Sequence, residues 1–167
     1  PGARGAREKF FSPLADEGAP KAAGYIFLPG GYPELHAPQL ASARTFKTSM
    51  ACHAAAGTAI YGECGGYMVL GRGLVDAKGA RHEMLGLLPL ETSFQTRKLH
   101  LGYRQLTPLS DHFTGVLGAH EFHYATTLTA NGPPLFAAED ADGVFLDNMG
   151  LHIGQTCGSF AHIISGP

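Results

Sequence analysis

The segment Gly62-Glu63-Cys64-Gly65-Gly66 constrains the fold of this chain more than any other. It follows the apolar run 58–61 and precedes the apolar run 67–70. A nucleophile framed by glycines in this way is typical of a strand that turns directly into a helix, because glycine tolerates the crowding of such a turn. The segment therefore predicts a buried strand, a tight turn with Cys64 in a strained conformation, and a helix.

The same position suits Cys64 for nucleophilic chemistry. The partial positive charge at a helix N-terminus favours the reactive thiolate. The amide of Gly65 would face an oxygen that becomes negative when a carbonyl is attacked. A free cysteine is more often a small buried filler, but the glycine frame favours catalysis here. Cys52 and Cys157 lack such a frame, and we interpret both as packing residues.

Strand-like and helix-like segments alternate through the first half of the chain. Gly57 follows the helical spacing of 38–56 and is a suitable C-terminal stop. This alternation predicts an α/β fold with an open, mostly parallel sheet flanked by helices. The expected elements are strand 23–28, helix 38–56, strand 58–62 and a helix from 67.

Gly30 and Gly31 follow the first expected strand. Carboxyl ends of neighbouring parallel strands meet at one edge of a sheet, so these glycines should lie beside the Cys64 turn. Their backbone N–H groups would supply the second half of an oxyanion hole. We accordingly expect Gly30, Gly31 and Gly65 to bind substrate.

After Gly71 the sequence consists of short β-like runs separated by turn residues. This pattern predicts an antiparallel β extension packed on the α/β half. No internal repeat or linker divides the chain, so we expect one domain over residues 1–167. The β-like runs are 73–76, 81–88, 91–95, 100–107, 120–129, 143–147, 151–154 and 160–164.

Composition excludes several classes of function. The net charge is −2 without a Lys/Arg cluster, which argues against nucleic acid and anionic membranes as partners. No apolar run approaches the roughly 18 residues of a membrane span. The three cysteines form no CxxC pair, so we expect neither a structural metal site nor a disulfide framework. These features predict a cytoplasmic protein with reduced thiols.

A thiol nucleophile needs a base near neutral pH, and histidine is the natural one. Among nine histidines, His162 could lie at a strand end beside Cys64. Strand alternation places His120 and Phe122 on one face and Glu121 and His123 on the other, which disfavours a metal pair there. His100 and these residues are left as hydrogen-bonding or substrate-contacting candidates.

Six segments in order resemble the C-terminal glutamine amidotransferase domain of the cobyrinic acid (or hydrogenobyrinic acid) a,c-diamide synthases. The resemblance extends from about Phe10 to the C-terminus. The segments are 28–36 (LPGGYPELH), 61–66 (YGECGG), 86–92 (GLLPLET), 100–104 (HLGYR), 120–124 (HEFHY) and 158–162 (GSFAH).

The resemblance implies a class I, flavodoxin-like domain that hydrolyses glutamine for amidation of the a and c carboxylates of the corrin ring. It implies Cys64 as nucleophile and His162 as general base, with Gly31 and Gly65 as backbone oxyanion positions. No metal or other cofactor is expected in this chain. ATP and Mg²⁺ are expected in a separate synthetase domain or subunit, which with its corrin substrate is the expected partner. A homodimer is left open.

The chain departs from the family pattern at three points. The acidic residue expected two positions after the histidine is replaced by Ile164, so what orients His162 is open. The first strand of such domains has no counterpart in Pro1–Lys9, and no phosphate-binding GxxxxGK[ST] segment exists. We therefore expect a glutaminase domain without its first strand and without the N-terminal ATP-binding domain.

Three alternatives remain. The related cobyric acid synthases share the cysteine and histidine, although the segments 86–92 and 100–104 favour the diamide synthases. A cysteine hydrolase of another class could use the same turn on a small ester or peptide. A catalytically inactive amidotransferase-like module could only bind a partner. Tyr103, Arg104, His120 and His123 could line a domain interface or an ammonia path, or serve only the sheet.

Overall fold

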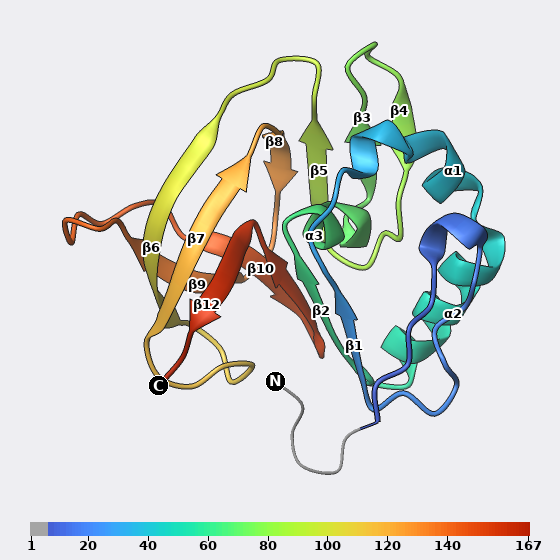
Figure 1. Ribbon diagram of the computed structural model, residues 1–167, viewed down its shortest axis with the longest axis horizontal. Coiled ribbons are helices and arrows are strands. Elements are labelled where there is room, and N and C mark those ends of the chain that lie inside the picture. The colour runs from blue at the N-terminus through green and yellow to red at the C-terminus, as the bar shows by residue number, and fades with distance from the viewer. Residues whose placement is uncertain (1–6) are drawn as a thin grey trace.

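The computed structural model describes residues 7–167 (Figure 1). The helical elements are η1 Pro13–Ala15, η2 Pro33–Leu35, α1 Ala37–Ser42, α2 Arg44–Ala55 and α3 Gly65–Leu70. The strands are β1 Tyr25–Leu28, β2 Ala59–Glu63, β3 Gly73–Val75, β4 Arg81–Glu83, β5 Leu90–Ser93, β6 His100–Pro108, β7 Leu117–His123, β8 Thr126–Ala130, β9 Pro134–Glu139, β10 Met149–Ile153, β11 Thr156–Ser159 and β12 Ala161–Ser165.

The strands form two sheets. The larger sheet has the order β1-β2-β11-β10-β9-β6-β7-β12, and the smaller has the order β4-β3-β5-β8. In the larger sheet only the β1–β2 and β2–β11 pairings are parallel, and the other five are antiparallel. The α/β class and the antiparallel extension are confirmed. The sheet is mixed rather than mostly parallel, because the extension continues the α/β sheet instead of packing on it.

The parallel part of the larger sheet includes a strand, β11, that the sequence pattern did not predict. β11 contains no β-branched residue after Thr156, yet it pairs with β2 and is buried along its whole length. A Cβ built on Gly158 would lie 2.6 Å from the carbonyl oxygen of Gly62, so the small residues permit close approach of the two backbones. Backbone proximity rather than β-propensity places this strand.

The expected helix 38–56 is two helices. α1 and α2 meet at Ala43, which leaves the helical region with φ −73° and ψ 83°. Gly57 adopts φ +74° directly after α2, a conformation that favours glycine, so the predicted C-terminal stop is confirmed. In Figure 1 both helices lie on the side of β1 away from the antiparallel strands of the larger sheet.

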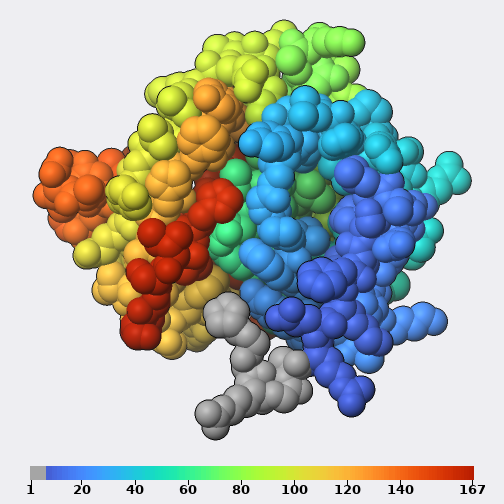
Figure 2. Space-filling view, in the orientation of Figure 1, coloured from blue at the N-terminus to red at the C-terminus, as the bar shows by residue number. Residues whose placement is uncertain are grey.

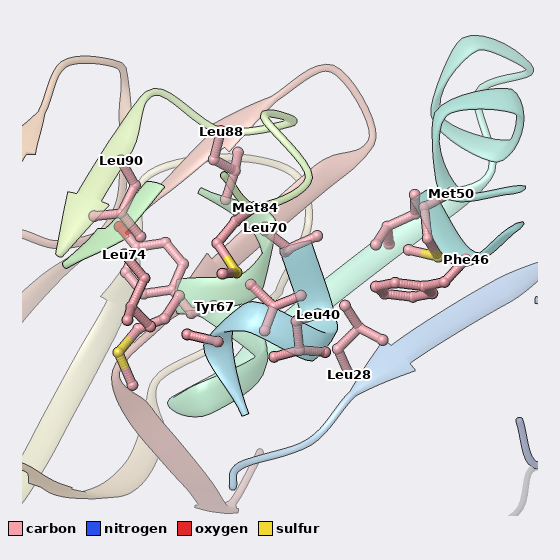
Figure 3. Close-up of a cluster of buried hydrophobic side chains, with 14 of the residues drawn as sticks. Leu28, Leu40, Phe46, Met50, Tyr67, Leu70, Leu74, Met84, Leu88 and Leu90 are labelled. Atoms are coloured by element: carbon pink, nitrogen blue, oxygen red, sulfur yellow. The ribbon is translucent and has the colours of Figure 1, made fainter. Parts of the chain in front are cut away.

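The main hydrophobic core lies between these helices, α3, the β1–β2 edge of the larger sheet and the smaller sheet. All six residues of α3 are buried, which explains why its sequence is apolar without an amphipathic period. Phe46 and Met50 cover β1 from α2, and full burial of such side chains contributes about 1.5–3 kcal/mol each. Figure 3 shows this cluster, with Leu28, Leu40, Phe46, Met50, Tyr67, Leu70, Leu74, Met84, Leu88 and Leu90 labelled.

Two further expectations concern chain segments outside the core. Residues 143–147 do not form a strand, and Phe145 makes one isolated bridge to Glu139. β9, which was not expected, lies between β10 and β6 in the larger sheet instead. Of the segment Pro1–Lys9, residues 1–6 lie outside the described residues, and 7–9 have no regular secondary structure. Within residues 7–167 no helix has the length and apolar character needed to cross a membrane.

Candidate active site

Cys64 occupies the sharp turn between β2 and α3. Its backbone adopts φ +50° and ψ −104°, a combination that is rare outside glycine, and the residue is 7% exposed. The strained turn expected from the glycine frame is therefore confirmed. The conformation places the sulfur at the carboxyl end of the parallel strands, where ligands bind in open α/β sheets.

The flanking glycines are required by close packing. A Cβ on Gly62 would lie 2.6 Å from the side chain of Leu70 and 2.8 Å from the backbone of Gly66. A Cβ on Gly66 would overlap the carbonyl oxygen of Leu28 and lie 2.6 Å from the carbonyl carbon. Strand β1 thus passes directly against the first turn of α3, and a side chain at Gly66 would force them apart. A side chain at Gly62 would instead separate β2 from α3.

The surroundings of the sulfur keep Cys64 protonated in the resting structure. Burial raises the pKa of the thiol to about 11, and the backbone N–H of Gly65 opposes this rise. The carboxylates of Glu63, Glu34 and Glu121 raise the pKa further. The expected stabilisation of the thiolate by the helix N-terminus is therefore outweighed. The thiol instead donates a hydrogen bond to the carbonyl oxygen of Phe122 at 3.7 Å.

We predict that alkylation of Cys64 by iodoacetamide accelerates through pH 9 and continues to accelerate toward pH 11. Only the thiolate reacts, and a raised pKa leaves little of it at pH 7. Mass spectrometry of the Cys64 peptide over a pH series measures the rate, with exposed Cys52 as the reference for reagent access. A rate that reaches its plateau below pH 8 would show that the resting site already holds a thiolate.

His162 comes to Cys64 from the C-terminal strand β12. A Cβ built on Gly30 would lie 2.7 Å from Cε1 of His162, 3.6 Å from its Nε2 and 3.7 Å from Cβ of Cys64. Both side chains therefore border the space above Gly30, which only glycine leaves open. Figure 2 shows green atoms from the middle of the chain between red β12 and the blue segment that follows β1. The structure brings the predicted nucleophile and base together.

The two predicted oxyanion positions also meet. A Cβ on Gly65 would lie 2.6 Å from the carbonyl oxygen of Gly31 and 2.8 Å from its nitrogen. The loop after β1 thus lies directly against the start of α3, as expected for parallel strands that end at one edge. The backbone N–H of Gly65 lowers the pKa of the Cys64 thiol, so it favours negative charge at the reacting centre.

His162 has a carboxylate partner that the sequence analysis missed. Nδ1 of His162 lies 3.1 Å from Oε1 of Glu63, and Oε2 of Glu63 accepts the backbone N–H of Ile163 at 3.2 Å. Ile164, at the position where the family carries an acidic residue, is 62% exposed. Glu63 stands inside the motif already singled out, so an acidic residue beside the nucleophile was the available signal.

Residues of β6 and β7 form a second polar cluster. Glu121 and His123 are buried on one face of β7 while Phe122 is partly exposed on the other, so the predicted alternation is confirmed. Glu121 accepts from Arg104 and pairs with Nε2 of His123, each at 2.9 Å. Burial alone would raise the pKa of Glu121, but His123 and Arg104 lower it below its usual value.

This cluster has the composition of a metal site without its geometry. Ligand atoms of His100, Glu121 and His123 lie within 4.8 Å of one another. The two imidazole rings, however, are stacked with centroids 4.5 Å apart and planes at 5°, so their lone pairs run side by side rather than converge on one ion. The guanidinium of Arg104 forms an ion pair with the second carboxylate oxygen of Glu121. Hydrogen bonding fits this arrangement better, and the absence of a metal stays a prediction.

The remaining residues considered in the sequence analysis are Tyr103, Cys157 and Cys52. Tyr103 is exposed and packs edge-on against His120, whose register partner on β12 is His162. Cys157 is buried, and its pKa is raised to about 12, which confirms its packing role. Cys52 is exposed on α2, so its interpretation as a packing residue was wrong; helical periodicity in this segment did not identify the buried face.

The architecture is that of the glutamine amidotransferases. One solved crystal structure of a glutamine amidotransferase superposes with a TM-score of 0.57, covering 85% of this chain and 71% of that chain at 16% identity. The structure of PurLQS from Thermotoga maritima gives 0.54 at 17% identity, covering 83% and 68%. These similarities show the fold. The model of the CobB/CobQ-like glutamine amidotransferase domain matches residues 2–167, and the chain belongs to this family.

Curated relatives indicate which group of enzymes within this family the chain is similar to. The hydrogenobyrinate a,c-diamide synthase of Rhizobium meliloti (strain 1021) is 55% identical over 163 residues, which cover 96% of this chain and 38% of that protein. The enzyme of the same name from Brucella abortus biovar 1 is 58% identical over 164 residues, covering 96% and 37%. The chain thus spans somewhat more than a third of the length of these relatives.

Proposed function

We propose that this chain is the glutaminase part of a hydrogenobyrinate a,c-diamide synthase. The observation that carries the proposal is the meeting of Cys64 and His162 above Gly30, beside the backbone of Gly31 and Gly65. Relatives at 55–58% identity carry that name, which favours the metal-free corrin substrate over the cobalt-containing one. The wider family and the site support release of ammonia from glutamine.

In the first half of the reaction, Cys64 loses its proton to His162 and its sulfur attacks the side-chain amide carbon of glutamine. The carbonyl oxygen becomes negative and is stabilised by the amides of Gly65 and Gly31. His162 then gives the proton to the departing nitrogen, and ammonia leaves. A γ-glutamyl thioester remains on Cys64. The raised pKa of the thiol makes this transfer to a base necessary rather than optional.

In the second half, His162 removes a proton from water as the water attacks the thioester carbon. The same amides stabilise the oxyanion, and the carbon–sulfur bond breaks. His162 returns the proton to the sulfur, so glutamate leaves and Cys64 is a neutral thiol again. Glutamine and water are thus converted to glutamate and ammonia, and the side chains return to their starting state.

The ammonia would serve an ATP-dependent synthetase domain or subunit that amidates the a and c carboxylates. The relatives are more than twice as long as the matched segment, which leaves room for such a domain in them. ATP and Mg²⁺ belong to that part of the proposal, and glutamine is the substrate of this chain. A free thiol nucleophile fits a reducing compartment, so we also propose a cytoplasmic location.

The test is glutamate release from glutamine, measured with the chain in its full-length protein or together with its synthetase. We predict that His162→Ala lowers kcat about 10²-fold or more, because His162 is the imidazole that borders the space above Gly30 together with Cys64. His152→Ala is the matched control, since His152 packs against His112 away from the site. Equal rates for the His162→Ala variant and the unmodified protein would contradict the assignment of the base.

A further inference from the structure

We propose that Glu63 is the positioning residue for His162, and that it takes the place of the acidic residue missing at position 164. The inference rests on the proposed function, because His162 matters only if Cys64 needs a base. It identifies a third member of the catalytic arrangement on a different strand from the histidine.

Both oxygens of the Glu63 carboxylate are engaged. Oε1 lies 3.1 Å from Nδ1 of His162. Oε2 accepts the backbone N–H of Ile163 at 3.2 Å and the hydroxyl of Tyr61 at 3.4 Å. The Glu63 side chain is 14% exposed, so little water competes for these positions. The carboxylate is therefore fixed both to its own strand and to the backbone beside the histidine.

This arrangement selects one tautomer of the imidazole. A carboxylate only accepts hydrogen bonds, so Nδ1 of a neutral His162 must carry the proton. Nε2 is then unprotonated, and it lies 3.6 Å from the Cβ position of Gly30, a point that is also 3.7 Å from Cβ of Cys64. When His162 takes the proton of the thiol, the negative charge of Glu63 stabilises the imidazolium.

The path of the chain explains how a residue 99 positions away reaches His162. Ser159 at the end of β11 pairs with Glu63 at the end of β2. The chain then crosses through Phe160 into β12, which pairs with β7 at the other edge of the larger sheet. Glu63 lies at the point where the chain crosses. A side chain at position 164 is exposed instead, so an acid there could not perform this role without rearrangement.

Several other titratable groups surround the pair. Tyr61 on β2 bonds to Glu63, and Tyr25 on β1 carries a pKa of about 12, raised by burial and in part by the Glu63 charge. His120 on β7 lies opposite His162 in the register. Cys64 follows Glu63 directly. Of these groups, only Glu63 bonds to the ring of His162, which singles it out as the partner.

The experiment is the Glu63→Gln substitution in the full protein, with glutamate release measured as a function of glutamine concentration and pH. The amide side chain introduced at position 63 has the same size as the carboxylate, and its oxygen can still accept the N–H of Ile163. We expect kcat to fall about 10²-fold or more with little change in KM, because orientation of the base rather than substrate binding is lost. The fall in kcat should persist across the pH series, because an amide no longer selects the tautomer in which Nε2 of His162 is unprotonated.

Glu83→Gln is the matched control, because it makes the same change at an exposed carboxylate that pairs with Lys47 away from the site; its rate and pH profile should change little. Thermal unfolding shows whether each variant remains folded. ¹⁵N NMR of labelled His162 gives a readout independent of turnover: Nδ1 should carry the proton in the unmodified protein, and both tautomers should be populated in the Glu63→Gln variant.

The outcomes separate the two proposals. An unmodified protein that releases no glutamate would overturn the proposed function itself. An active unmodified protein together with a Glu63→Gln variant of equal kcat, pH profile and His162 tautomer would overturn only the role of Glu63. A fall in activity that is matched by lost thermal stability, with an unchanged His162 tautomer, would show a purely structural role and also overturn it.

Discussion

Replacement of Cys64 by alanine is expected to abolish glutamine hydrolysis, lowering kcat about 10³-fold or more. No other side chain at the β2–α3 turn can form the thioester, and among the three cysteines Cys157 is buried elsewhere while Cys52 is exposed on α2. Alanine keeps the Cβ and thus the strained backbone, so the fold should persist. Glutamate release and circular dichroism measure the two effects.

Cys52→Ser is the matched control for this substitution, because it removes a thiol that lies outside the site. It should retain full activity. Substantial hydrolysis by the Cys64→Ala variant would contradict covalent catalysis at this position. It would leave water activated by His162 as the nucleophile, a mechanism in which the strained turn has no evident purpose.

Gly66→Ala is expected to have the largest effect on stability. The added Cβ would overlap the carbonyl oxygen of Leu28, and neither backbone can move without separating β1 from α3. We expect a loss of about 3 kcal/mol or more in the free energy of unfolding, with a fall in Tm of about 6–12 °C. Differential scanning calorimetry or denaturant titration gives the value.

Gly24→Ala is the control for this prediction. A Cβ on Gly24 meets nothing within 4 Å, and its φ lies outside the left-handed region, so its effect should stay within about 0.5 kcal/mol. Equal Tm values for the two alanine variants would mean that β1 and α3 do not lie as close as the structure places them. The geometry of the Cys64 turn would then have to be revised as well.

Local sequence predicted those parts of the fold whose cause is local. The run 58–70 contains an apolar strand, a glycine-framed turn and an apolar helix, and it folds as β2, the Cys64 turn and α3. Gly57 ends α2 because its positive φ is a property of the residue itself. The alternation along β7 was readable for the same reason, since the two faces of a strand differ in burial.

Parts of the fold that depend on distant backbone were not predictable. β11 is a strand because Gly158 fits against Gly62, and neither residue favours a strand by itself. Its position between β2 and β10 makes the larger sheet mixed. The break at Ala43 is equally invisible, because alanine there is a good helix former and its neighbours give no turn signal.

The site shows the same division. The motifs identified Cys64, His162, Gly30, Gly31 and Gly65, and the structure places these residues close together. The contact between Glu63 and His162 depends on where β12 begins after β11, which sequence spacing does not reveal. The direction of the pKa shift of Cys64 was also inaccessible, because its acidic neighbours come from three separate segments.

The most direct test of a glutamine site at Cys64 is covalent labelling with 6-diazo-5-oxo-norleucine, a glutamine-like electrophile, followed by peptide mass spectrometry. The full protein is treated with and without an excess of glutamine. Labelling of Cys64 alone, suppressed by glutamine, is the predicted result. Failure to label Cys64, or labelling of Cys52 and Cys157 to the same extent without protection by glutamine, would contradict a glutamine pocket around this cysteine.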